Sequence, residues 1–210
     1  AIILDGNRRW AKQHGKLIIE GHRQGALTIK KLINVLRENG IHTITVWIFS
    51  TENWSREKEQ VFSLMRIIEI FLDSYFNEAI KDEVRIIHLG RKERIPDSLR
   101  KKIVEAERKT AHFTERVLNI GLDYGGRDEI IRAIHAIKME DGRTSEISEK
   151  EFEEYLDTKG QKYPFPDMII RTGGEMRMSG FMTWQRAYAE YFFEKKYLPD
   201  MKKSDILTVW

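Results

Sequence analysis

The feature that most constrains this chain is a regular alternation of short apolar segments with longer amphipathic ones. The short segments are rich in β-branched and aromatic residues, which is typical of buried strands. They lie at 2–4, 41–49, 84–89, 117–122, 168–170 and 189–193. Strands that alternate with helices pair in parallel and are covered by those helices. The order therefore predicts an α/β fold with about six mostly parallel strands flanked by helices.

The segments between the strands carry helix signals. Apolar residues recur at helical spacing in 22–39, and helices are also predicted at 55–77, 96–112 and 127–138. Ser55 is expected to cap the second of these helices, and residues 139–144 are expected to form a loop. Ser148 and Glu151 form a capping box for a short further helix. Residues 1–210 are expected to be a single domain trimmed at both ends.

Composition excludes several classes of protein. Lys and Arg number 36 against 33 Asp and Glu, a net charge of +3, which disfavours a nucleic-acid-binding tail. Aromatic residues are not interleaved with basic ones as base stacking requires, so no nucleic-acid partner is expected. The absence of cysteine removes disulfides, thiolate metal sites and cysteine nucleophiles, and fits a reducing compartment. Nucleotide-binding glycine loops and the G-x-S-x-G hydrolase motif do not occur.

Arginine follows the predicted strands where each one ends. Ligands of open α/β sheets bind beyond the carboxyl ends of the strands. Five of these ends carry the arginines Arg8 and Arg9, Arg56, Arg91, Arg127 and Arg171. The planar guanidinium suits phosphate oxygens, and Gly173-Gly174 would let backbone N–H groups approach such a ligand. A phosphate-bearing ligand is therefore predicted from the joint pattern, although any one of these arginines taken alone is more often a solvated loop residue.

A single carboxylate, Asp5, lies among these cations. Mg²⁺ is commonly held by few carboxylates together with phosphate oxygens and water, so Asp5 predicts Mg²⁺ that bridges phosphate oxygens. Taken alone, Asp5-Gly6-Asn7 is only a turn signal. His22 near this loop is equally well explained by function and by packing.

Five blocks stand in a fixed order along the chain. They read LDGNRRWA at 4–11, GHRQG at 21–25, FSTENWSR at 49–56, DYGGR at 123–127, and RTGGE at 171–175 continuing through AYAE at 187–190 to PD at 199–200. In content, order and spacing these blocks resemble the cis-prenyltransferases, the undecaprenyl diphosphate synthase family. The resemblance covers nearly the whole chain.

The resemblance implies a homodimeric, Mg²⁺-dependent enzyme with an apolar tunnel beside its sheet. Such an enzyme would condense isopentenyl diphosphate onto an allylic diphosphate, here farnesyl or geranylgeranyl diphosphate, to give a short- to medium-chain Z-polyprenyl diphosphate. It would lie in the cytoplasm and contact membranes transiently through its lipid product.

The resemblance also implies roles for individual residues. Asp5 and Asn53 would be catalytic, and Asp5 would hold Mg²⁺ together with Glu190, which reaches across the dimer interface. The allylic diphosphate would be bound by Gly6, Asn7, Arg8, Arg9, Trp10, His22 and Arg56. Isopentenyl diphosphate would be bound by Arg171, Arg177 and Ser179. The segment of Asn53, Trp54 and Arg56 would close over the site.

Apolar residues late on the second strand and along 61–76 are candidates to line the tunnel. Trp47 and Ile48 stand where smaller residues are common in the family, so they predict a short or medium product if they face the tunnel. The stripe of Phe62, Met65, Ile68, Leu72 and Tyr75 either lines the tunnel or packs in the core.

Four positions depart from the family pattern, and one of them is Arg8, where bacterial members usually have glycine. Ile18, Met176 and Gly180 replace an arginine, a histidine and an asparagine, and Arg8 is a candidate substitute for the missing arginine. The departures leave two alternatives open. One is a divergent member that performs a branched condensation or transfers to another acceptor. The other is a noncatalytic subunit of a heteromeric enzyme, which the retention of Asp5 and Glu190 disfavours.

Overall fold

A single six-stranded sheet organises the chain. The computed structural model describes residues 1–141 and 146–209. The strands are β1 Ile2–Ile3, β2 Thr43–Ser50, β3 Arg85–Leu89, β4 Val117–Tyr124, β5 Met168–Arg171 and β6 Glu190–Phe193. Their order is β3-β4-β2-β1-β5-β6, and every neighbouring pair is parallel. The predicted α/β class and the six strands are confirmed.

The predicted helices are present, and the structure adds further short helices and shifts some of the helix ends. The helices are α1 Asn7–Gln13, α2 Ile18–Glu38, η1 Thr51–Ser55, α3 Lys58–Lys81, α4 Asp97–Thr110, α5 Gly126–Asp141, α6 Glu149–Glu153, η2 Leu198–Asp200 and α7 Lys203–Val209. Helix α1 was predicted only as a turn, and η1, η2 and α7 were not predicted. Ser55 does not cap α3, because its hydroxyl donates to the Glu52 carbonyl oxygen at 2.8 Å. Helix α5 extends through 139–141, where a loop was predicted, and the rest of that loop lies outside the described residues.

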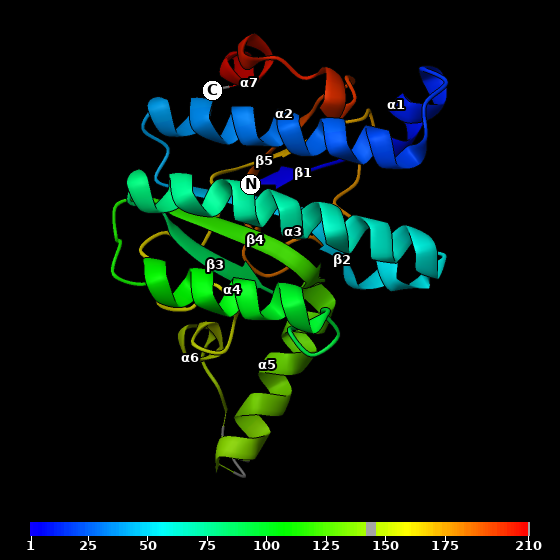
Figure 1. The fold of residues 1–210 in the computed structure, drawn as a ribbon. Helices are drawn as coiled ribbons and strands as arrows, with labels where there is room; N and C mark the ends of the chain where they lie inside the picture. Colours follow the sequence, from blue (N-terminus) through cyan, green and yellow to red (C-terminus); the bar gives the residue numbers. More distant parts are fainter. Residues whose placement is uncertain (142–145, 210) are drawn as a thin grey trace.

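Helices α2, α3 and α4 lie side by side over one face of the sheet (Figure 1). On α2 the buried residues Ile29, Leu32, Ile33 and Leu36 repeat at one-turn spacing, so a single stripe of the helix faces the sheet. These residues share one core with the sheet and with α3 and α4. The apolar periodicity seen in the sequence thus becomes the main hydrophobic core.

The opposite face of the sheet is covered largely by irregular chain rather than by helices. The segment 172–189 places Phe181 and Met182 against the sheet, where the Phe181 ring stacks on Trp47 at 5.0 Å between ring centroids. This segment contains Gly173, Gly174 and Gly180 at positive φ, which a helix does not accommodate. The prediction of flanking helices therefore holds for one face and in part for the other.

The strand order decides which loops meet. Strands β2, β1 and β5 are neighbours at the centre of the sheet, whereas β3 and β4 form one edge. The segments that follow β2, β1 and β5 consequently leave the sheet together. Among the described helices, none is long and apolar enough to cross a membrane.

Candidate active site

Asp5 and Arg171 form the centre of the candidate site. Asp5 follows β1, Arg171 ends β5, and Ile3 and Arg171 are paired across the two strands. The Arg171 guanidinium donates from Nη2 to Asp5 Oδ2 at 2.8 Å, and Arg9 Nη2 lies 3.1 Å from Asp5 Oδ1. Arg171 is buried. The Asp5 carboxylate therefore joins Arg9, a predicted ligand of the allylic diphosphate, to Arg171, a predicted ligand of isopentenyl diphosphate.

The surroundings of Asp5 keep it ionised. Burial acts to raise the pKa of Asp5, but the hydrogen bond and charge of Arg171, the charge of Arg9 and the Gly6 N–H together lower the pKa below its ordinary value. The buried Thr172 hydroxyl donates to the Asp5 carbonyl oxygen at 2.7 Å and lies 3.0 Å from the Asp5 N–H, which donates to it. The backbone of Asp5 is thus fixed, and its ionised carboxylate is held among cationic side chains.

A second carboxylate links the two predicted diphosphate sites. Glu175 Oε1 accepts from Arg9 Nη1 at 3.1 Å, and Glu175 Oε2 accepts from Arg177 Nη1 at 2.5 Å. Arg171 Nη1 donates to Ser179 Oγ at 3.0 Å and also to the Arg177 carbonyl oxygen. Arg171, Arg177 and Ser179 are therefore brought together as predicted.

Two glycines of α2 let α1 approach closely. A Cβ on Gly25 would stand 2.2 Å from Asn7 Oδ1, and one on Gly21 would stand 2.2 Å from the Asn7 carbonyl oxygen. Any side chain there would push Asn7 and the start of α1 away from α2. The GHRQG block is thus explained by packing, which places Asn7 at the site.

His22 lies between two cations at the junction of two hollows. Its Nε2 atom is buried and has no hydrogen-bond partner among the described residues. Burial, followed by the charges of Arg56 and Arg8, lowers the pKa of His22 to about 4, so the imidazole is neutral at physiological pH. His22 thus lies beside the predicted ligands of the allylic diphosphate, and its functional role stays a prediction.

The apolar cavity begins at these polar groups and runs between the sheet, α2 and α3. Its volume is about 250 Å³. Asp5, Asn7, His22, Asn53, Arg56, Arg171 and Ser179 lie at its polar end. Its apolar walls include Ile29, Trp47, Ile48, Leu64, Ile68 and Phe71. The expected tunnel is therefore present, and Trp47 and Ile48 both line it.

A bulge in β2 accounts for the direction of Ile48. The register with β4 steps from Trp47–Gly121 to Phe49–Leu122, so Ile48 has no partner across the strand pair. A bulged residue bends its strand and re-aims its side chain. Ile48, Ile68 and Phe71 also border a further void of about 10 Å³, so they separate the cavity from it.

The predicted stripe on α3 divides between cavity and core. Ile68 lines the cavity and Leu72 the small void. Met65 and Tyr75 are buried in the core, where the Tyr75 hydroxyl accepts from Arg37, and Phe62 is 68% exposed. Leu64, Ile67 and Phe71 take part in the lining instead.

A wider basic hollow opens beside Asp5. It has a volume of about 710 Å³ and carries the cations Arg8, Arg9, Lys12, Lys16, Arg56 and Arg177. Ile18 lies in this hollow, where the family pattern has arginine, and Arg8 also lines it, as its proposed substitution requires. Lys12 and Lys16 were not predicted. Lys12 stands four residues after Arg8, so these two would have indicated a common helix face had α1 been recognised, whereas Lys16 lies beyond the end of α1.

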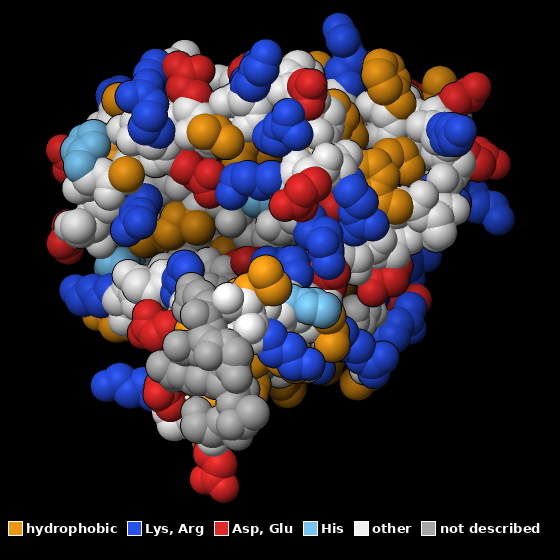
Figure 2. Space-filling view, turned by 90° about the horizontal axis from the view of Figure 1, so that it is seen from below, with side chains coloured by type: hydrophobic (Ala, Val, Ile, Leu, Met, Phe, Trp, Pro, Cys, Tyr) orange, Lys and Arg blue, Asp and Glu red, His pale blue; other side chains and the backbone are white. Residues whose placement is uncertain are grey.

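This concentration of arginine is local. Positive and negative side chains are interspersed over the face shown in Figure 2. Arg91 and Arg127, which follow β3 and β4, do not line the basic hollow: Arg91 pairs with Asp128 at 2.8 Å, and Arg127 lines a different hollow. Three of the five arginine-bearing strand ends therefore converge, around β1, which pairs with both β2 and β5.

Two predicted site residues lie away from these hollows. The Trp10 indole donates to Asp200 Oδ1 at 2.7 Å and stacks on His14, so it anchors α1 and lines neither hollow. Glu190 is exposed at the start of β6, level with Met168. It stands three residues, about 10 Å, along the sheet from the level of Arg171. Within one chain it does not join Asp5.

The protein side chains at the site suit Mg²⁺ only when a substrate diphosphate supplies further ligands. No cluster of three or more His, Cys, Asp or Glu side chains in the described part of the chain is placed to hold a metal. Asp5 is one ionised carboxylate beside a hollow built for phosphate. Mg²⁺ accepts such a site when phosphate oxygens and water complete its ligands. The residues present therefore fit Mg²⁺ that binds with a diphosphate.

Comparison with known proteins agrees with this geometry. A family model described as putative undecaprenyl diphosphate synthase matches residues 3–210. The isoprenyl transferase of Thermotoga maritima is 43% identical, over 99% of this chain and 89% of its own. The ditrans,polycis-undecaprenyl-diphosphate synthase ((2E,6E)-farnesyl-diphosphate specific) of Micrococcus luteus is 41% identical, over 98% and 84%.

Two solved structures share the fold. Lavandulyl diphosphate synthase from Lavandula x intermedia, in complex with dimethylallyl diphosphate, has a TM-score of 0.93 at 37% identity and covers 99% of this chain and 90% of its own. A probable undecaprenyl diphosphate synthase from Campylobacter jejuni has a TM-score of 0.79 at 30% identity, with the same coverage.

The sheet order, the arginine-lined hollow and the apolar cavity define an α/β prenyl diphosphate synthase. With the family match over nearly its full length, the chain belongs to the undecaprenyl diphosphate synthase family. It is a cis-prenyltransferase.

Proposed function

We propose that this cis-prenyltransferase condenses isopentenyl diphosphate onto an allylic diphosphate, farnesyl or geranylgeranyl diphosphate, and makes a short- to medium-chain Z-polyprenyl diphosphate. The observation that carries the proposal is the continuity of the polar and apolar parts of one cavity. Asp5, Arg171 and Ser179 lie at its polar end, and Ile48, Ile68 and Phe71 border its apolar end. A diphosphate with an isoprenoid tail has this division of chemistry.

The cations of the basic hollow stabilise the charge that forms when the allylic substrate ionises. Breaking the allylic C–O bond leaves charge on the departing diphosphate. Arg9, Arg8 and Arg56 are held where that charge develops, and prepositioned cations stabilise it without reorganising. Glu175 occupies Arg9 and Arg177 in the free protein, which keeps both guanidinium groups in place until a diphosphate takes them.

Arg171, Arg177 and Ser179 orient the second substrate. They would hold the diphosphate of isopentenyl diphosphate so that its double bond faces the allylic carbon, which is the positioning that carbon–carbon bond formation requires. Joining these two sites through Asp5 keeps their separation fixed. The new bond forms as the alkene attacks the allylic carbon, and a proton then leaves the attacking unit.

Mg²⁺ is proposed to bind at Asp5 together with the substrate diphosphate. When bound there it supplies Lewis-acid stabilisation of the departing diphosphate. Glu190 is proposed to act on Mg²⁺ only in a homodimer, from the partner's chain. Transient contact with a membrane through the lipid product is likewise proposed.

The size of the cavity limits the tail. Pockets for drug-sized ligands usually measure about 300–1,000 Å³, and this cavity of about 250 Å³ lies just below that range. Ile48, Ile68 and Phe71 close it toward the neighbouring void. These dimensions favour the short end of the proposed product range.

The same observations support a second candidate, a non-standard condensation between short substrates. Ile18 leaves the basic hollow without one expected arginine, and the compact cavity suits short tails. The high structural similarity to lavandulyl diphosphate synthase, which was solved with dimethylallyl diphosphate, points in the same direction.

A primer series distinguishes the two candidates. Purified protein is incubated with Mg²⁺, labelled isopentenyl diphosphate and one of dimethylallyl, geranyl, farnesyl or geranylgeranyl diphosphate, and products are identified by mass spectrometry. Linear Z-products from farnesyl or geranylgeranyl diphosphate support elongation. Products formed from dimethylallyl diphosphate alone support the second candidate. A folded protein that uses none of these substrates would refute both.

A further inference from the structure

One buried carboxylate near the site has no part in the mechanism above. Asp123, the penultimate residue of β4, is fully buried and has φ of +53°. A non-glycine residue at positive φ stores strain and persists when its surroundings hold it there. The DYGGR block is thus more than a turn, and its carboxylate points to specific partners.

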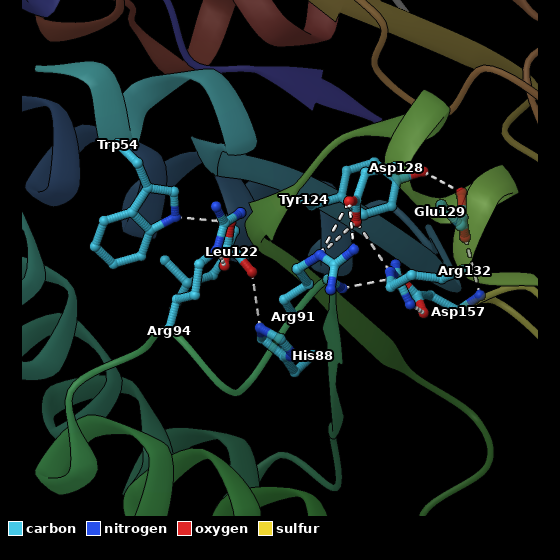
Figure 3. Close-up of polar contacts among 12 residues, drawn as sticks. Trp54, His88, Arg91, Arg94, Leu122, Tyr124, Asp128, Glu129, Arg132 and Asp157 are labelled. Carbon is cyan, nitrogen blue, oxygen red and sulfur yellow. Dashed lines mark hydrogen bonds and ion pairs between the residues drawn. The ribbon is translucent and has the colours of Figure 1, made fainter. Parts of the chain in front are cut away.

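Two side chains from different segments donate to Asp123. Trp54 Nε1 donates to Asp123 Oδ1 at 2.8 Å, and Arg94 Nε donates to Oδ2 at 2.9 Å, with Arg94 Nη2 also donating to Oδ1. The Arg94 guanidinium carbon lies 5.5 Å from the centre of the Trp54 ring, a cation–π contact. Figure 3 shows Trp54 and Arg94 converging from the segments that follow β2 and β3.

A glycine brings Arg94 within reach. Gly90 has φ of +118°, and a Cβ there would stand 2.5 Å from the Leu122 carbonyl oxygen and 2.6 Å from that of Asp123. The segment 90–96 therefore passes directly over the end of β4, where the Arg91 N–H donates to the Asp123 carbonyl oxygen at 3.1 Å. Arg91 itself turns away and pairs with Asp128 (Figure 3).

The other side of Trp54 leads into the active site. Trp54 belongs to η1, between Asn53 and Arg56, and both of these residues line the apolar cavity. The Ser50 N–H donates to Asn53 Oδ1 at 3.2 Å, and the Arg56 N–H donates to the Asn53 carbonyl oxygen at 3.2 Å. Because this turn is short and internally bonded, displacing Trp54 displaces Asn53 and Arg56 with it.

We propose that Asp123, Arg94 and Trp54 form a clamp that positions Asn53 and Arg56 over the allylic diphosphate. Arg94 is a positioning residue: its side chain is 45% exposed and lines neither the cavity nor the basic hollow. The proposal rests on the proposed function for its catalytic consequence, and on the contacts alone for its effect on the segment 50–56.

The consequence is selective because the two diphosphate sites are built from different segments. Arg171 ends β5, Arg177 and Ser179 follow it, and their side-chain hydrogen bonds among the described residues go to Asp5, to Glu175 and to one another. Loosening the clamp is therefore expected to lower kcat/KM for the allylic diphosphate and to leave the KM for isopentenyl diphosphate nearly unchanged. A misplacement of about 1 Å at a reacting group costs roughly 100-fold in rate.

The test compares Arg94→Gln with Arg91→Gln, a neighbour on the same segment that pairs with Asp128 instead. Two measurements are made on the full chain: hydrogen exchange of the peptide that covers 50–56, and KM and kcat for each substrate. Arg94→Gln is expected to speed exchange in 50–56 and to lower kcat/KM for the allylic diphosphate by roughly 10- to 100-fold. The KM for isopentenyl diphosphate should stay within about twofold, and Arg94→Lys should recover part of the loss because it keeps the charge.

Trp54→Phe keeps an aromatic ring, although a smaller one, and removes the N–H donor. Combined with Arg94→Gln, its effect on kcat/KM should be less than additive, because both changes break the same clamp. Exchange in 50–56 that is unchanged in Arg94→Gln would overturn the proposal, as would equal effects of Arg94→Gln and Arg91→Gln. If the wild-type protein transfers no prenyl group, the proposed function fails, and the exchange measurement still decides on the clamp.

Discussion

Replacing Ile48 with alanine should lengthen the product. Ile48 has no partner across the β2–β4 pair, and it borders both the cavity and the void of about 10 Å³ behind it. The substitution removes three carbon atoms at this boundary, and the void itself holds about one water-sized probe. Together these make room for about one more five-carbon unit.

The size of the effect follows from burial and from pocket energetics. At about 0.8 kcal/mol per buried CH₂, the half-buried Ile48 loses at most about 2 kcal/mol of stability on truncation. One methylene more or less in an apolar pocket is worth about 1–3 kcal/mol of discrimination. The ratio of the longer to the shorter product should therefore rise by roughly 10-fold or more.

The assay resolves labelled products by chain length under limiting isopentenyl diphosphate. Ile44→Ala is the matched control, because Ile44 lies on the same strand, is buried and lines neither the cavity nor the small void. It should cost about 2–5 kcal/mol of stability and leave the product distribution unchanged. An unchanged distribution in Ile48→Ala, or the same shift in Ile44→Ala, would refute the reasoning.

Three further predictions concern the site and its support. Asp5→Asn should abolish the enhancement of inorganic pyrophosphate binding by Mg²⁺ without weakening binding in EDTA, measured by calorimetry; retained enhancement would contradict the metal assignment. Burial lowers the pKa of His88 to about 3, so the unfolded state takes up a proton first as pH falls below about 6.5, and stability should decrease toward pH 3 by about 3–5 kcal/mol in total. Urea titrations should show a flatter pH dependence in His88→Gln, and an equally steep one would argue against this histidine. Gly25→Ala places a Cβ 2.2 Å from Asn7 Oδ1 and should cost about 1–3 kcal/mol in thermal unfolding and reduce kcat/KM, so wild-type kinetics would contradict the packing account.

The sheet could be predicted because its strands are buried runs with clear ends. All eight residues of β4 are buried, and its apolar sequence at 117–122 needs no long-range information to be recognised. Helix α1 was missed because it has only seven residues, with Ala11 as its one buried side chain. It is held by contact with α2, and no periodic stripe marks it in the sequence.

The site could be predicted in part, because strand order is a tertiary property. Polar residues at strand ends are visible in the sequence, but which ends meet depends on the pairing of β1 with both β2 and β5. Arg91 and Arg127 were therefore grouped with the site although they follow β3 and β4, on the far side of β2 from β1. The direction of Ile48 depended on a bulge that arises only from strand pairing.

Carboxylate partners were harder to foresee than cations. Glu175 lies in a recognised block, yet its bridge between Arg9 and Arg177 depends on side-chain geometry. The same holds for Asp123, whose partners come from segments that are far apart in the sequence. Spacing along a chain carries no signal for such contacts.

The central claim is that the Asp5 pocket performs prenyl transfer, and incorporation of labelled isopentenyl diphosphate tests it most directly. Wild-type protein, Asp5→Ala and Arg91→Gln are assayed with Mg²⁺ and each allylic primer, and folding is checked by circular dichroism. We predict incorporation by the wild type and by Arg91→Gln, and a loss on the order of 100-fold or more in Asp5→Ala. Incorporation that survives in Asp5→Ala, or that is missing from a folded wild type with every primer, would contradict the account.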